Sequence, residues 1–197
     1  LEKGYELSDI QVLSPMYAGN AGITVLNQAL QETFNPKTVD KNEVRLGYIT
    51  FREGDKILQL KNQPDDEVSN GDIGTLIEIV DAKETEDKKT TIVVDFDGSF
   101  VEYKPDSFSN ITLAYCISVH KSQGSEYPIV IMPFAKNQWI MLNKKLIYTA
   151  ITRCKNTLIL IGNKEVFFQG CNVEERHQRN TKLVQKIEIE SKSISEI

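Results

Sequence analysis

One polar stretch, residues 119–127, lies between two apolar runs, 111–118 and 129–134. Runs of this length that are rich in β-branched residues indicate buried strands. The stretch between them contains a histidine, a lysine, two serines, an amide and a carboxylate, which predicts a polar loop joining two core strands. Because loops at strand ends in α/β domains commonly hold ligands, we expect a functional site in this loop.

Strands and helices alternate on both sides of the middle of the chain. Apolar spacing predicts them over residues 10–14, 23–34, 129–134, 143–152, 157–161 and 164–169. A turn with two glycines, residues 16–22, separates the first strand from the first helix. Residues 1–50 and 109–170 are therefore expected to form an α/β layer around a mainly parallel sheet.

The pattern changes from about residue 51, and residues 37–50 before it are ambiguous. Four short strand-like runs follow, over residues 57–60, 73–80, 91–96 and 100–103. Asp97-Gly98 between two of these runs is a strong signal for a hairpin with a type I′ turn. Short strands at intervals of about ten residues predict a small antiparallel barrel inserted at 51–108.

Composition excludes some classes of protein. A net charge of −5 argues against a protein that coats polyanions, although local basic clusters can still contact phosphates. No apolar stretch approaches the roughly 18 residues that span a bilayer, no leader peptide is visible, and a start at Leu1 predicts a piece of a longer protein. The cysteines have no pairing or zinc spacing, which predicts reduced thiols in a cytoplasmic protein without a metal site; they are Cys116, Cys154 and Cys171.

A phosphate-binding loop of the Walker type, G-x-x-x-x-G-K-[ST], does not occur in the sequence, and no carboxylate cluster suggests a magnesium site. Residues 148–155 nevertheless deliver Arg153 at the end of a predicted helix, directly before a strand. An arginine in such a place can bind phosphate in a bidentate manner. The alternative is a surface arginine favoured by the helix dipole.

Four segments in order resemble the second RecA-like domain of superfamily 1 DNA helicases, most closely the RecD-like branch. Residues 13–17 are similar to the motif IV region, 119–126 to motif V and 148–153 to motif VI, while 54–56 and 70–74 resemble the start of the inserted SH3-like barrel. The resemblance implies a RecA-like parallel sheet of the P-loop NTPase type, interrupted by that barrel. It also explains the missing Walker loop, which lies in the preceding RecA-like domain of this family.

The resemblance further implies a nucleotide site in the cleft toward that preceding domain. Arg153 is expected to be the arginine finger on the γ-phosphate, and Glu126 to accept hydrogen bonds from the ribose hydroxyls. Gly124 would allow the backbone close to the nucleotide, and Gln123 would couple the nucleotide to the DNA. The cofactor is ATP with Mg²⁺, the metal being held mainly by the missing domain.

Single-stranded DNA is the implied partner on the other side of the loop. His120, Lys121 and Ser122 are expected to donate to phosphate oxygens, and Met16 and Tyr17 to contact the strand. Four of them have an ordinary alternative: a strand cap for His120, a solvated Lys121, and packing under the loop for Met16 and Tyr17.

Other features around these motifs stay open. Ala18 stands where relatives often carry a basic residue. A phosphate contact made by that residue would be absent or moved in this chain. Trp139 can stack on a base or pack in a lid, and Tyr127 is expected in the core. The charged tail, residues 171–197, is expected to be partly helical with a solvated basic face.

The sequence thus predicts the C-terminal motor half of an ATP-dependent DNA helicase, moving 5′→3′ by resemblance and inactive without the preceding domain. The alternative is a non-catalytic nucleic-acid-binding or protein-docking module that uses the barrel. A third possibility is the helicase half of a conjugative relaxase. Other subunits, and a role in repair, recombination or transfer, are left open.

Overall fold

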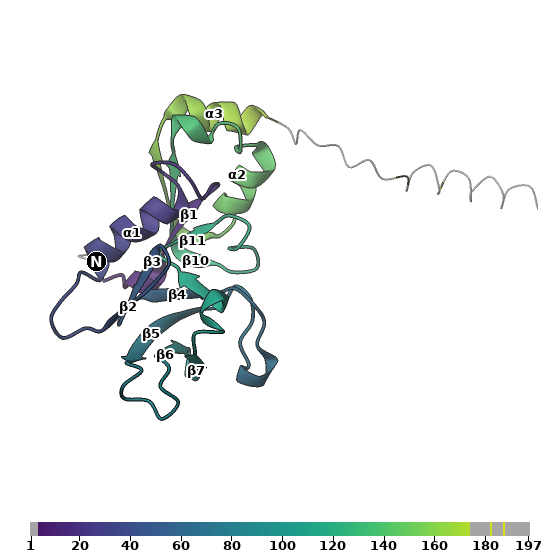
Figure 1. Cartoon of the computed structure of the whole chain (residues 1–197). Coiled ribbons are helices and arrows are strands. Elements are labelled where there is room, and N and C mark those ends of the chain that lie inside the picture. The colour runs from purple at the N-terminus through teal and green to yellow at the C-terminus, as the bar shows by residue number, and fades with distance from the viewer. Residues whose placement is uncertain (1–3, 174–181, 183–186, 188–197) are drawn as a thin grey trace, which may run out of the picture.

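The computed structural model describes residues 4–173, 182 and 187 (Figure 1). Two sheets lie one above the other, a parallel one beside the three α-helices and an antiparallel one at the opposite end of the molecule. The predicted charged tail lies outside the described residues from 174 on, apart from 182 and 187. Short 3-10 helices are η1 (Leu7–Asp9), η2 (Pro64–Asp66), η3 (Phe108–Asn110) and η4 (Lys136–Gln138).

The parallel sheet has four strands in the order β11-β10-β1-β9. They are β1 (Ile10–Ser14), β9 (Cys116–Ser118), β10 (Tyr127–Phe134) and β11 (Cys154–Gly162). All three pairings are parallel, with Val12 opposite Ile131 on one side and opposite Cys116 on the other. The predicted strands at 10–14, 129–134 and 157–161 are confirmed, the last two with extra residues at their ends.

Helices cover both faces of this sheet because successive side chains in a strand point to opposite sides. On one face, α1 (Ile23–Phe34) buries Ile23 against Val12 and Cys116. On the other face, α2 (Lys144–Ile151) and α3 (Lys164–Asn172) bury apolar side chains against Leu13 and Met132. Asparagine side chains cap both helices at the N-terminus, Asn143 accepting from Leu146 N at 2.9 Å and Asn163 from Val166 N at 3.0 Å.

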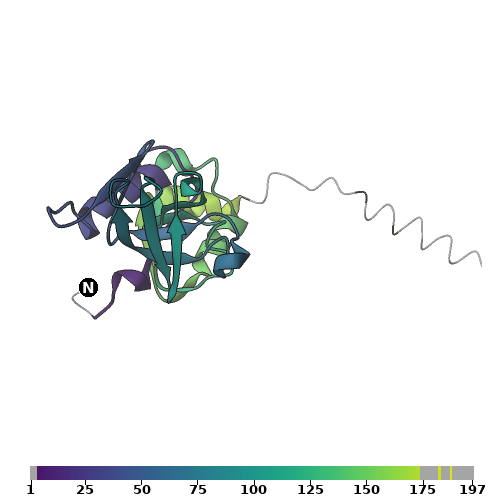
Figure 2. The same cartoon turned by 60° about the horizontal axis from the view of Figure 1, so that its bottom comes forward.

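The antiparallel sheet has the strand order β7-β6-β5-β4-β8 and folds around its own apolar core (Figure 2). Its strands are β4 (Lys56–Gln59), β5 (Ile73–Val80), β6 (Thr91–Phe96), β7 (Ser99–Tyr103) and β8 (Ile111–Leu113). Asp97 and Gly98 join β6 to β7 with φ of 52° and 97°. Positive φ at both central residues is the type I′ geometry, so that prediction is confirmed.

The ambiguous residues 37–50 contribute a second hairpin, formed by β2 (Glu43–Leu46) and β3 (Ile49–Arg52). A two-residue turn joins the strands, since Leu46 pairs with Ile49. Val44, Leu46 and Ile49 pack against the core of the antiparallel sheet. The hairpin therefore belongs to the antiparallel part of the molecule, although it forms a separate sheet.

The prediction of one strand over residues 111–118 is wrong. The segment forms β8, which pairs with β4 in the antiparallel sheet, and then β9, which pairs with β1 in the parallel sheet. Ala114 and Tyr115 make the crossing and are both buried, with Ala114 N donating to Lys56 O at 2.8 Å. One apolar run therefore serves two sheets. The domain limits expected at 51 and 108 stay a prediction.

Candidate functional site

The polar loop that follows β9 is a compact series of turns. Lys121 N and Ser122 N both donate to Ser118 O, at 3.0 and 3.2 Å, and Ser125 N donates to Ser122 O at 3.2 Å. His120, Gln123 and the residues beyond remain at the surface, including Gly124 and Glu126. These backbone bonds make the loop one connected unit, so its exposed side chains are presented from a common base.

Ser122 differs from its neighbours in the loop. Its side chain is fully buried, and its hydroxyl donates to Val119 O at 2.8 Å. The hydroxyl therefore holds the turn, and the geometry gives no support to a contact with DNA. Tyr127 at the end of the loop is buried as expected for a core residue, with 7% of its surface exposed.

Arg153 binds back onto the loop from the end of α2. Its Nη1 donates to Ser125 O at 3.1 Å and its Nε to Thr149 O at 3.3 Å, while its own carbonyl accepts from Tyr127 N at 2.8 Å. Glu126 lies in the same loop, 3.4 Å from the Lys155 ammonium in an exposed pair. Exposed pairs of this kind are weak, so Glu126 can exchange its partner. The structure thus joins the predicted finger directly to the loop that carries Gly124, Gln123 and Glu126.

A groove of 640 Å³ gathers predicted DNA-side residues from distant parts of the chain. Met16 and Tyr17 line it from the segment after β1, and His120 and Lys121 line it from the loop. The carboxyl ends of β1 and β9 lie side by side in the parallel sheet, which explains why these segments meet. Four of the five residues predicted to contact DNA therefore lie around one groove.

Asn70 and Met141 also line this groove and were not predicted. Asn70 Oδ1 accepts from the Lys121 ammonium at 2.6 Å, which joins the antiparallel sheet's loop to the parallel sheet's loop. Asn70 is itself fixed, since its N–H donates to Asn62 Oδ1 at 2.7 Å. In the sequence, Asn70 was visible only as part of a turn.

Gln138 is a second unpredicted residue. It is fully buried, and its Nε2 donates to Ala21 O at 3.0 Å and to Ser14 Oγ at 3.3 Å. These bonds fix the glycine-containing turn that carries Met16 and Tyr17. Trp139 next to it is half exposed and lines a different hollow, beside the start of α3.

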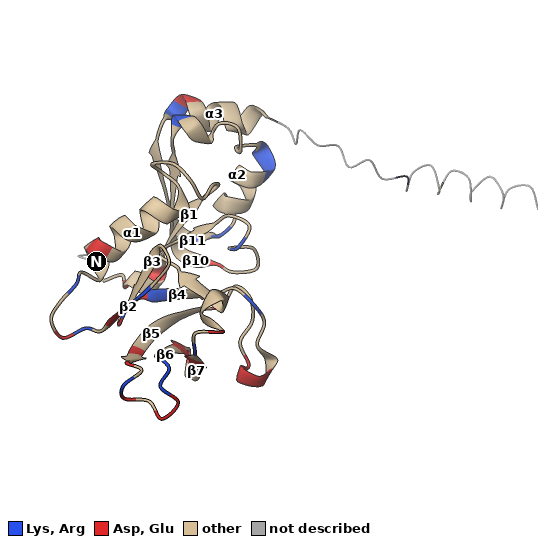
Figure 3. Ribbon diagram, in the orientation of Figure 1, with Lys and Arg blue, Asp and Glu red and all other residues tan. Residues whose placement is uncertain are grey.

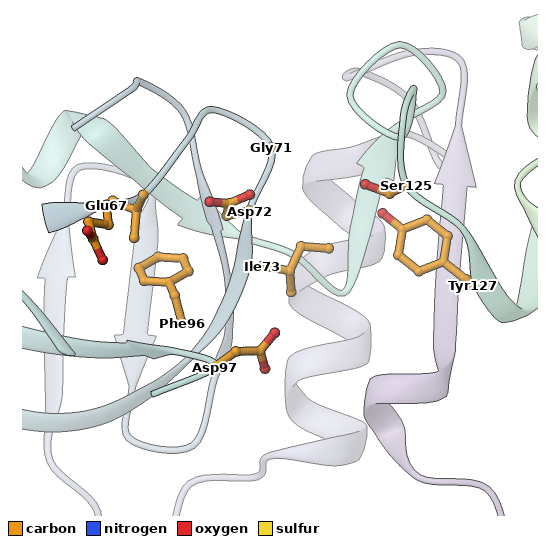
Figure 4. A pocket seen from close by; sticks show the side chains of 9 residues that line it. Glu67, Gly71, Asp72, Ile73, Phe96, Asp97, Ser125 and Tyr127 are labelled. Atoms are coloured by element: carbon orange, nitrogen blue, oxygen red, sulfur yellow. The ribbon is translucent and has the colours of Figure 1, made fainter. Parts of the chain in front are cut away.

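A smaller hollow of 340 Å³ separates the loop from the antiparallel sheet (Figure 4). Ser125 and Tyr127 point toward one another on one side, and the carboxylates of Asp72 and Asp97 lie across from them. Burial raises the pKa of the Tyr127 hydroxyl. The carboxylates in this hollow would repel a phosphate. We therefore expect anionic ligands beside Arg153 and in the groove with His120 and Lys121.

Charge over the antiparallel sheet is mixed, with basic and acidic segments alternating along its loops (Figure 3). Within residues 4–173, 182 and 187, no three His, Cys, Asp or Glu side chains come together as metal ligands. The helices in that part of the chain are also too short or too polar to cross a bilayer.

Comparisons with known proteins agree with this arrangement. Residues 26–96 match the SH3 domain of ATP-dependent RecD-like DNA helicases, and residues 113–161 match the UvrD-like helicase C-terminal domain. The ATP-dependent RecD2 DNA helicase of Deinococcus radiodurans is 34% identical over 178 residues, 90% of this chain and 23% of that protein. The RecBCD enzyme subunit RecD of Buchnera aphidicola is 29% identical over 163 residues, 80% of this chain and 25% of its own. The chain therefore spans about a quarter of the length of these relatives.

Solved structures of Pif1 helicases have the same fold. Bacteroides Pif1 in complex with ADP-AlF3 and single-stranded DNA superposes with a TM-score of 0.53 at 15% identity, covering 92% of this chain and 45% of that one. Candida albicans Pif1 gives 0.52 at 16% identity, covering 94% and 50%. The predicted fold class, a RecA-like parallel sheet with an SH3-like domain, is confirmed. The chain belongs to the RecD-like branch of superfamily 1 helicases, of which it contains the SH3 domain and the UvrD-like C-terminal domain.

Proposed function

We propose that this chain is the second motor domain of an ATP-dependent DNA helicase that travels 5′→3′ along single-stranded DNA. ATP with Mg²⁺ would bind between it and the preceding RecA-like domain of the same protein. The observation that carries the proposal is the contact of Arg153 with Ser125 O at 3.1 Å. This contact connects a phosphate-binding side chain to a loop whose other end borders the groove with His120 and Lys121.

The residues present fit one edge of a nucleoside triphosphate. Arg153 is only partly buried, and its planar guanidinium has donors in the geometry that suits phosphate. Gly124 has φ of +93°, and no heavy atom lies within 4 Å of where a Cβ would be, so backbone there is open to a ligand.

ATP, when bound, supplies the phosphoanhydride bond whose hydrolysis drives the cycle. In this chain, Arg153 would exchange part of its contact with Ser125 for the γ-phosphate and stabilise the charge that develops there. Because Ser125 lies in the same series of turns as Lys121 and Ser122, that exchange would shift the DNA side of the loop. Lys121 and His120 would change their grip on the strand accordingly.

The free thiols of all three cysteines support a cytoplasmic protein. We further propose that residues 1–197 alone do not hydrolyse ATP, because they contain no Walker loop. DNA-stimulated ATP turnover by the purified chain, abolished by Arg153→Ala, would show that this part of the proposal is wrong.

Arg153→Ala in the full-length protein tests the main proposal. Arginine fingers contribute about 10³–10⁵ to turnover, so we expect ATP hydrolysis to fall by about that factor while affinity for single-stranded DNA changes little. Turnover is measured by phosphate release and DNA binding by fluorescence anisotropy.

Arg153→Lys serves as the matched control for that variant. It keeps the charge but lacks the planar fork, so most of the activity should still be lost. Thermal unfolding of both variants separates loss of the contact with Ser125 from loss of catalysis. Normal hydrolysis combined with lost DNA affinity would place Arg153 on the wrong side of the cleft.

A further inference from the structure

A second groove, of 880 Å³, runs between α1 and the hairpin β2–β3. Ile23 and Asn27 of α1 form one wall, and Leu46 and Ile49 of the hairpin form the other. The groove also includes Tyr17, which the DNA-side groove shares. Tyr17 therefore borders both grooves.

The hairpin presents an aromatic side chain at its tip. Tyr48 is 90% exposed and follows Gly47, whose φ is +61°. A glycine with positive φ at the first central position is the type II′ turn, whose twist matches the flanking strands. The tip is therefore a defined turn, and most of the Tyr48 ring surface is open to a ligand.

The base of the hairpin is anchored to α1 by polar contacts. Gln31 Nε2 donates to Thr50 O at 2.9 Å, and the Arg52 guanidinium pairs with Glu32 at 3.0 Å and with Glu43 at 2.6 Å. The Arg52 side chain is only 4% exposed and Glu43 17%, so their pair within the hairpin is largely shielded from solvent, whereas Glu32 on α1 is 62% exposed. The hairpin thus holds its tip at a fixed position relative to α1.

The charged groups in this groove neutralise one another. Arg52 is bonded to both Glu32 and Glu43, and Lys37 pairs with Glu43 at 2.6 Å. A neutral, mostly apolar floor suits an uncharged planar ring better than a phosphate. Arg45, next to the tip and exposed, donates its Nε to Gly47 O at 3.3 Å, and its terminal nitrogens lie at the surface, where they can reach a phosphate outside the groove.

We propose that this groove is a nucleobase site that extends the single-strand track, with Tyr48 as its stacking platform and Arg45 contacting an adjacent phosphate. Tyr17 lies where the strand passes from one groove to the other. Aromatic side chains beside a cationic group are the usual arrangement for binding single strands without sequence preference. The inference rests on the proposed function, because it requires a strand in the groove with His120 and Lys121.

The test compares Tyr48→Ala and Tyr48→Phe with the wild type in the full-length protein. Phe100→Ala is the matched control, because Phe100 is 65% exposed on β7, away from the groove. Fluorescent oligothymidylates of about 4 to about 16 nucleotides, the range of common single-strand site sizes, are titrated without nucleotide. Tyr48→Ala should weaken binding of the longest oligonucleotides about tenfold, as expected for one lost stacking contact. Binding of the shortest should not change, and Tyr48→Phe and Phe100→Ala should resemble the wild type.

A 2-aminopurine base moved along the longest oligonucleotide provides a second readout. Stacking on Tyr48 should quench its fluorescence at one or two positions, and the quenching should disappear in Tyr48→Ala and persist in Tyr48→Phe. Equal binding of every length by Tyr48→Ala and the wild type would overturn the inference and leave the groove to a peptide. An equal loss at every length would also overturn it, since Tyr48 would then act on the whole site. A wild type that binds no oligonucleotide would refute the proposed function itself.

Discussion

Replacing Asp55 by alanine should remove the main polar connection between α1 and the antiparallel sheet. The carboxylate is fully buried and accepts four hydrogen bonds. The donors are Gln31 Nε2 at 2.6 Å, Arg52 N at 2.7 Å, Asn35 Nδ2 at 2.8 Å and the Tyr115 hydroxyl at 3.0 Å. They come from α1, from β3 and from the crossing between β8 and β9, so a single side chain joins three segments.

The loss of stability in Asp55→Ala depends on which of the four donors keep another hydrogen-bond acceptor. Gln31 Nε2 retains Thr50 O and Asn35 Nδ2 retains Glu53 O, at 2.9 and 3.0 Å, whereas the Arg52 N–H and the buried Tyr115 hydroxyl lose the carboxylate as acceptor. A stranded buried donor costs about 1–3 kcal/mol, and each bond to a charged group contributes about 1.5–3 kcal/mol. Burial also raises the pKa of the Asp55 carboxyl, so its removal relieves some desolvation. We expect the free energy of unfolding to fall by about 3–4 kcal/mol.

Urea denaturation followed by circular dichroism measures this change. Tyr115→Phe is the matched variant, because it removes one donor and leaves the carboxylate its other three bonds; it should lower stability by about 1 kcal/mol. In the double variant the two effects should not add, since both report on the same bond. A loss below about 1 kcal/mol for Asp55→Ala, or strict additivity, would refute the reasoning.

Two further predictions concern single lysine contacts. Burial lowers the pKa of Lys56 to about 8 from 10.5, so the unfolded chain binds more protons between these values and wild-type stability rises with pH across that window. Relative to Lys56→Met, the wild type should gain about 3 kcal/mol between pH 7 and pH 11, measured by urea denaturation; a difference that does not vary with pH contradicts this. Asn70→Ala leaves the Lys121 ammonium without its acceptor at 2.6 Å and should weaken single-strand binding about threefold to tenfold by anisotropy. Asn172→Ala, far from the groove, is its control, and equal affinities of both variants would remove Asn70 from the site.

An element could be predicted from the sequence wherever its own residues specify its conformation. The Asp97-Gly98 turn was predictable because few other residue pairs tolerate positive φ twice. The helix from Ile23 was predictable because Ile23, Leu26 and Leu30 recur at helical spacing and pack together. The burial of Asn27 and Gln31, expected on the opposite face, was not predicted. The β2–β3 hairpin was missed, since most of its side chains are at least partly exposed and give little alternation of apolar and polar residues.

Features that depend on distant partners were not predictable. Residues 111–118 are mostly apolar, and nothing within them indicates that the pairing partner changes from β4 to β1 at Ala114 and Tyr115. Likewise, Asn70 and Lys121 are 51 positions apart, and only the fold brings them together. The exposed loop residues were recognisable by their motif, whereas the burial of Ser122 required the turn geometry.

The crossing between β8 and β9 has a mechanical consequence. Two residues, Ala114 and Tyr115, separate a strand of the SH3-like sheet from a strand of the RecA-like sheet, and Gln11 Nε2 holds both of their carbonyls, at 3.0 and 3.3 Å. There is no slack in this connection to absorb a rotation. Torque on the SH3-like sheet would therefore act on β9, and through it on the loop that begins at Val119. Under the function proposed above, the SH3-like sheet would act as a rigid arm on the motor domain, and a load on it would reach the loop whose Ser125 O binds Arg153.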